Sequence, residues 1–119
     1  MAGIDEMAKD LGMALARTEE YQALKRASDA AENDRDLVEL RNRIGSIEAE
    51  LEATLRAGRE PADELRQRYE AAAGEIQAMP AFQRVVAAQS NFEKVMYRVN
   101  ETVARGIEEG ARSRIIIAS

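Results

Sequence analysis

The chain of 119 residues contains no cysteine, no histidine and no tryptophan. Without cysteine it cannot form a disulfide, a thiolate nucleophile or a cysteine-bound zinc or iron–sulfur site. Without histidine it lacks the usual general base of Ser-His and Cys-His catalysis, and the histidine ligands of di-iron helical bundles. Carboxylates, lysines, serines and tyrosines are present, so these absences narrow the catalytic possibilities without closing them.

Glycine, proline and aromatic residues are scarce, with 7 Gly, 2 Pro, 2 Phe and 3 Tyr. Few chain breakers predict long elements, and 22 alanines, the best helix formers, make up much of the apolar 45%. The larger apolar side chains (Leu, Ile, Val, Met and Phe) number only 29, which fill the core of a domain this size poorly. We predict one all-α domain over residues 1–119, with ends at about 1–4 and 112–119 that fray.

The formal net charge is −5, from 17 Lys and Arg against 22 Asp and Glu. An acidic chain lacks the dense cationic stripe that binds a nucleic-acid backbone, so we do not expect direct binding to nucleic acid. No apolar run is long enough to predict a membrane span, and the first ten residues, MAGIDEMAKD, do not resemble a signal peptide. We expect a cytoplasmic protein.

Helical spacing of apolar residues divides the chain into about five segments. The first, about residues 4–16, has one apolar face formed by Ile4, Met7, Leu11 and Leu15. The second, about residues 19–31, follows Thr18, which is a good N-cap because its side chain can accept a backbone N–H. Asn33 and Asp34 then mark a break, and either can cap the next helix.

The clearest pattern lies in the third segment, about residues 35–57. Its apolar residues recur three and four apart, close to a coiled-coil seam. They are Leu37, Leu40, Ile44, Ile47, Leu51 and, one place late, Leu55. Gly45 interrupts this helix at a cost of about 1 kcal/mol, and we expect another helix to cross closely there. Gly58 is the expected C′ residue that ends the helix.

A fourth segment begins at Pro61, and Pro80 separates it from a fifth, about residues 81–105. The fifth repeats the heptad in two rows, formed by Phe82, Gln89, Met96 and Val103, and by Val85, Phe92 and Val99. Gln89 is the polar member. It either fixes the register of the seam or points to its rim.

The lengths of the third and fifth segments favour an elongated helical hairpin or bundle. At 1.5 Å per residue they span about 35 and 38 Å, comparable to the whole diameter of a compact globule of this chain length. A lone hairpin would leave an apolar face in water, so we expect a homodimer through coiled-coil-like seams. The predicted packing and interface residues are Leu37, Leu40, Ile44, Ile47, Leu51, Leu55, Phe92, Met96, Val99 and Val103.

No cluster of residues indicates chemistry. The glutamates that could be imagined as a metal site lie on polar faces without histidines: Glu48, Glu52, Glu75 and Glu93. The stretch RAGR (56–59) lacks the spacing of a phosphate loop, and the basic pairs Lys25–Arg26 and Arg66/Arg68 lack interleaved aromatics. We therefore predict no catalytic residue, no metal ligand and no cofactor. The apolar tail at Ile115, Ile116 and Ile117 is either a frayed end or a segment that docks on a partner.

The segment LGMALARTEEYQALKRA (11–27) resembles the YlbF/YmcA/YheA family of small bacterial helical proteins. The likeness continues through Asn33 and Asp34, the long helix after them, the turn 58–61 and the helix opened by Pro80, over about residues 5–107. It implies an all-helical subunit that dimerises or forms higher assemblies, and regulation rather than catalysis. Two branches of the family act with a third protein as accessory factors of a membrane-anchored endoribonuclease, and so influence mRNA processing, competence, sporulation and biofilm formation.

Some members of that family are associated with iron–sulfur clusters held by cysteines. This chain has no cysteine, which favours the YheA-like branch. The leading hypothesis is a non-enzymatic adaptor or regulator that binds other proteins, among them an endoribonuclease or its helper proteins. The alternative is an RNA-binding accessory protein that uses local arginine clusters.

Overall fold

The structure is a computed structural model that describes residues 3–118, with side chains described up to residue 112. This part of the chain is all helical. Its elements are α1 (Ile4–Ala16), α2 (Glu19–Glu32), α3 (Arg35–Arg56), α4 (Asp63–Ala78) and α5 (Pro80–Ala118). The predicted fold class is confirmed, and the third and fifth helices are indeed the longest, at 22 and 39 residues. Among the described helices, none has an apolar stretch that would cross a membrane.

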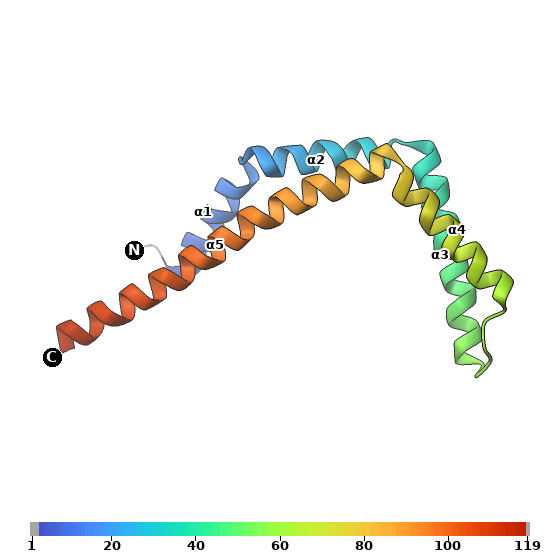
Figure 1. Cartoon of the computed structure of the whole chain (residues 1–119). Coiled ribbons are helices and arrows are strands. Elements are labelled where there is room, and N and C mark those ends of the chain that lie inside the picture. The colour runs from blue at the N-terminus through green and yellow to red at the C-terminus, as the bar shows by residue number, and fades with distance from the viewer. Residues whose placement is uncertain (1–2, 119) are drawn as a thin grey trace.

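The five helices form one long antiparallel hairpin with an elbow (Figure 1). One side of the hairpin consists of α1, α2 and α3, and the other of α4 and α5. In the short arm α3 packs along α4, and in the long arm α2 packs along α5, with α1 at the far end. The molecule measures 69 × 37 × 22 Å and has a radius of gyration of 22.2 Å. A compact globule of this length would have about 13–14 Å, so the predicted elongation is confirmed.

The elbow arises because both sides of the hairpin break at the same level. Between α2 and α3, Asp34 has extended backbone, and its Oδ1 accepts the Leu37 N–H at 3.1 Å. Between α4 and α5, Met79 is extended (φ −77°, ψ 126°), since a residue before proline resists the helical region. Pro80 then opens α5, where its missing N–H would have had no helical partner.

Other helix ends follow the expected local chemistry. The Thr18 Oγ1 accepts the Tyr21 N–H at 3.2 Å, as predicted for an N-cap. Gly58 has φ 73°, and the N–H groups of Gly58 and Arg59 bond to the carbonyls of Leu55 and Thr54 at 3.0 and 3.1 Å. These two bonds form a Schellman motif, which confirms Gly58 as the C′ residue.

Three sequence-based expectations were wrong in detail. Helix α4 begins at Asp63 rather than Pro61, because residues 57–62 are used to reverse the chain. Helix α5 continues to Ala118 rather than ending near residue 105, since Gly106 and Gly110 each oppose a helix by only about 1 kcal/mol. No helix crosses at Gly45, where an added Cβ would meet no atom within 4 Å.

The predicted fraying of the ends stays a prediction. Residues 1–2 and 119, and the side chains of Ile115–Ile117, lie outside what the structure describes.

Two small apolar clusters hold the short arm and the elbow. In the short arm, Leu40 and Ile47 of α3 are buried against Leu65 and Ala72 of α4. At the elbow the buried residues are Ala31, Leu37 and Ala81, covered by Met79, Phe82 and Val85. In the long arm, the Tyr21 and Phe92 rings meet edge to face with centroids 5.4 Å apart. These contacts follow one another along the hairpin and form a narrow seam rather than a rounded core.

Ion pairs between charged side chains on the helix surfaces contribute little to the stability of the fold. Within single helices, Arg56 pairs with Glu52 at 2.6 Å and Arg112 with Glu108 at 3.9 Å, each four residues apart. Between helices, Arg43 of α3 reaches across to Glu75 of α4 at 3.7 Å. All of these side chains are more than half exposed, so each pair contributes less than about 1 kcal/mol.

Replacing Ile47 by aspartate should lower the free energy of unfolding by more than about 3 kcal/mol, because Ile47 is only 1% exposed and its replacement buries an unpaired charge. Leu55→Asp is the matched control on the same helix. Leu55 is 63% exposed, so this change should cost less than about 1 kcal/mol. Urea denaturation followed by circular dichroism measures both, and equal losses would contradict the assignment of the short-arm seam.

Two glycine-to-alanine changes should shift stability in opposite directions. Gly45→Ala should raise the free energy of unfolding by about 0.5–1 kcal/mol, because Gly45 lies inside a helix with open space around it. Gly58→Ala should lower it by at least about 1 kcal/mol, because alanine resists the φ of 73°. The same denaturation measurement applies, and a loss of stability in Gly45→Ala would show a contact there.

Candidate interaction surface

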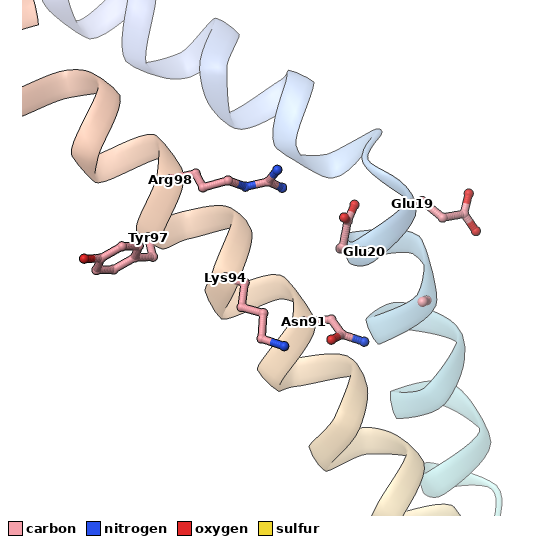
Figure 2. Close-up of a pocket in the computed structure, with 7 residues that line it drawn as sticks. Glu19, Glu20, Asn91, Lys94, Tyr97 and Arg98 are labelled. Carbon is pink, nitrogen blue, oxygen red and sulfur yellow. The ribbon is translucent and has the colours of Figure 1, made fainter. Parts of the chain in front are cut away.

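A concavity lies between α2 and α5 (Figure 2). Figure 2 shows Arg98 and Asn91 of α5 projecting toward α1 and α2, whereas Tyr97 points away from them. The concavity is lined by Glu19, Glu20, Ala23, Asn91, Lys94, Tyr97 and Arg98. Glu19 pairs with Arg26 of its own helix at 3.4 Å. The concavity is therefore bordered by acidic residues of α2 and basic residues of α5.

Outside this concavity, the described residues show no cluster of side chains suited to catalysis or metal binding. The Thr18, Thr54 and Thr102 hydroxyls donate to backbone carbonyls at 2.7–2.8 Å. The core contains no buried polar or charged residue among those described. Across the same residues, no three Asp or Glu side chains are placed to hold a metal ion. The glutamates singled out in the sequence are spread over three helices: Glu48 and Glu52 on α3, Glu75 on α4 and Glu93 on α5.

An apolar groove lies at the far end of the long arm, between α1 and α5. We call it the open groove, and its lining residues are Leu11, Val95, Arg98, Val99, Thr102 and Val103. Val103 is 50% exposed and Ile107, one turn further along α5, is 68% exposed. Helix α1 has no buried residue, and Ile4 and Met7 on its apolar face are 84% and 59% exposed.

The position of the open groove follows from the register of the hairpin. Tyr21 meets Phe92 in the long arm, and Ala31 belongs to the same buried cluster as Ala81 at the elbow. Each step back along α2 therefore corresponds to a step forward along α5. Continued into α1, this register places Leu11 opposite Thr102 and Val103, where it lines the groove. The seam of the long arm thus runs on into α1 and α5, but there it is not closed.

The apolar row predicted on α3 is largely buried by other helices of the same chain. Leu37, Leu40 and Ile47 are buried, and Ile44 and Leu51 are half-buried against the short-arm core. Leu55, the member that is out of step, is exposed. The burial of this row therefore does not require a second copy of the chain.

The row predicted on α5 divides into two parts. Phe92, Met96 and Val99 are half-buried, whereas Val103 is exposed. Gln89 is also exposed, which agrees with a position on the rim of the seam. Of the predicted interface residues, Leu55 at the end of α3 and Val103 on α5 have the most surface left for a partner.

Sequence reasoning did not assign interface roles to α1 or to Ile107. The signal was present, because Ile4, Met7 and Leu11 recur at helical spacing. Spacing shows that a face is apolar but not whether its own chain covers it. The exposure of α1 in the structure supplies that information.

Comparison with known proteins gives a family model and a solved structure. A family model described as control of competence regulator ComK, YlbF/YmcA, matches residues 4–108. No curated protein matches the chain by sequence. The fold is similar to Bacillus subtilis RicA, whose crystal structure was determined in complex with RicF, with a TM-score of 0.81 over 91% of this chain and 96% of that chain. The two sequences are 13% identical, so this likeness concerns the fold.

Proposed function

This chain belongs to the YlbF/YmcA family, and from that premise we propose that it is a non-enzymatic adaptor or regulator that acts by binding other proteins. The observation that carries the proposal is the exposed apolar surface of α1 and the end of α5, because a contiguous apolar surface on a soluble chain usually marks an interaction site. The RicA fold, crystallised with RicF as its partner, supports the same kind of function.

The specific process we propose is accessory control of endoribonuclease-dependent mRNA processing, with effects on competence, sporulation or biofilm formation. The family description, control of a competence regulator, supports this direction. The partners would be an endoribonuclease or its helper proteins, and the chain itself would act as a cytoplasmic homodimer. The lack of cysteine supports a YheA-like branch, without an iron–sulfur cluster held by thiolates.

Direct RNA binding through arginine clusters is the alternative function. One of the clusters noted in the sequence is partly neutralised, because Arg26 pairs with Glu19 at 3.4 Å. The alternative makes a distinct physical prediction, since binding to a phosphate backbone weakens steeply as salt is raised.

Affinity copurification from the organism that encodes the chain tests the proposal. The recovered proteins are identified by mass spectrometry, with half of each lysate treated with ribonuclease. We expect an endoribonuclease or its helper proteins in both halves, because the contacts are between proteins. Partners that disappear after ribonuclease treatment would favour the RNA-binding alternative, and recovery of the chain alone would contradict the adaptor function.

A further inference from the structure

We propose that the inner side of the elbow binds a basic amphipathic helix of another protein. The contact surface consists of an apolar groove at the elbow and the exposed face of α5 that runs from this groove to Tyr97. This role rests on the proposed function, that of a protein-binding adaptor, and gives it a surface and a chemical class of partner. The surface is separate from the open groove, which lies at the far end of the long arm.

The groove lies between the end of α4 and the start of α5. We call it the inner groove, and its lining residues are Gln77, Phe82, Gln83, Val86, Ala87 and Ser90. Its largest apolar members are Phe82 and Val86, and Val86 is 49% exposed. The Gln83 Nε2 donates to the Gln77 backbone carbonyl at 2.9 Å, which joins the two sides of the groove. The two helices therefore form an apolar groove whose polar members are all uncharged.

The inner groove lies on the side of α5 that faces away from α2. Ala88 and Val95 are buried in the seam of the long arm. Val86 and Ser90 lie two residues from Ala88, and Tyr97 lies two residues from Val95, so all three are about 200° around the helix from the seam. Figure 1 shows α5 on the inner side of the bend and α2 on its outer side. This face of α5 is therefore open to a partner within the bend.

Tyr97 extends this face beyond the inner groove. Its side chain borders the concavity between α2 and α5 but points away from α1 and α2 (Figure 2), and it is 67% exposed. Tyr97 lies 11 residues after Val86, which is about 16 Å along α5. Tyrosines are among the residues that most often anchor protein interfaces. A partner helix of about three turns, laid along α5, would contact both the inner groove and Tyr97.

Acidic side chains flank this face. Glu93 lies four residues before Tyr97 and Glu101 four residues after it, so both are neighbours of Tyr97 on the helix surface, and both are exposed. On the groove side of α4, Glu70 lies about two turns from the inner groove and is exposed. Arg66 lies on the same side about one turn further away.

The basic residues of this part of α5 lie mainly on its other side. Between residues 82 and 105 they are Arg84, Lys94, Arg98 and Arg105. Arg84 lies one turn before buried Ala88, and Arg98 projects toward α1 and α2 (Figure 2). The Arg105 Nη2 donates to Thr102, which lines the open groove beside α1. Lys94 lines the concavity at the border of the face.

Acidic groups therefore predominate on the inner face, with Glu70, Glu93 and Glu101 against Lys94 at its border and Arg66 at its far end. Charge complementarity selects a partner that carries Lys or Arg beside its apolar residues. The same charges repel a phosphate backbone, so the face is suited to a basic protein segment rather than to nucleic acid.

The first test measures binding of a fluorescent amphipathic peptide to the full chain by fluorescence anisotropy. The probe has about 14 residues, roughly four helical turns, with Leu on one face and Lys on the other. The control peptide has Glu in place of every Lys. We expect the Lys peptide to bind at least about tenfold more tightly than the Glu peptide, because only the former complements the acidic face. Equal binding of the two peptides, or no binding of the Lys peptide, would overturn the proposal.

Variants of the chain then locate the contact. The double change Glu93→Lys and Glu101→Lys should weaken binding of the Lys peptide at least about tenfold. Its control, Asp29→Lys with Glu32→Lys, alters the net charge equally but on the exposed surface of α2, on the outer side of the bend. This control should retain most of the binding. Equal losses in the two double variants would show attraction to the net charge alone and would overturn the placement.

Tyr97→Ala tests the apolar part of the contact. It should weaken binding of the Lys peptide at least about fivefold, because it removes the anchor beyond the inner groove. Leu55→Ala is the matched control, since Leu55 is 63% exposed but lies in the short arm. Circular dichroism checks that the helices of all variants are intact. Binding that is unchanged in Tyr97→Ala would contradict the proposed extent of the surface.

Copurification with the same variants separates this surface from the proposed function. We expect at least one partner protein of the wild-type chain to be retained by Leu55→Ala and lost from Tyr97→Ala and from the Glu93→Lys, Glu101→Lys chain. Variants that recover the full set of wild-type partners would overturn the inner surface and leave the adaptor function standing. A wild-type chain that recovers no partner would contradict the adaptor function, and this surface with it.

Discussion

The apolar seam between the two sides of the hairpin is one helix wide, and the whole fold depends on it. Helix α1 buries no residue and the other helices bury narrow rows of side chains; among the larger residues that the structure describes, only Leu37 and Ile47 are less than 2% exposed. Alanines such as Ala31, Ala72 and Ala88 fill much of the remaining contact. A seam this thin cannot draw five helices into a globule, so the chain stays extended, with a radius of gyration of 22.2 Å.

The same constraint explains where a partner can bind. The seam is closed over the short arm, the elbow and the part of the long arm where Tyr21 meets Phe92. Beyond Val99 the apolar row of α5 continues, but α1 does not bury it. The apolar faces of α1 and of the part of α5 beyond Val99 are therefore left uncovered by the chain itself. Another helix is the natural completion of such a surface, which links the narrow seam to a function in protein binding.

Local chemistry made much of this fold predictable from the sequence. The caps at Thr18 and Asp34, the left-handed Gly58 and the break before Pro80 depend on neighbouring residues alone. The apolar rows were also visible, because helical spacing survives without knowledge of the partner helix. The full length of α5 was not predicted, because the glycines at 106 and 110 destabilise a helix by too little to end it.

The spacing of apolar residues does not show which apolar row packs against which. The row on α3 was expected at an assembly interface, yet most of it packs on α4 of the same chain. The apolar face of α1 was visible but received no role, because spacing does not show whether a face is covered. Gly45 was expected at a close crossing, and its surroundings are open. These three outcomes depend on the path of the chain at the elbow. Few residues determine that path, and the spacing of apolar residues does not predict it.

Small-angle X-ray scattering of the purified chain tests the central claim most directly, namely that a one-helix-wide seam keeps the fold extended. The account predicts a radius of gyration of at least about 22 Å, close to the value of the single chain or larger in a dimer. A value near 13–14 Å, that of a compact globule of 119 residues, would contradict it, because the helices would then have closed on a core that the seam does not provide.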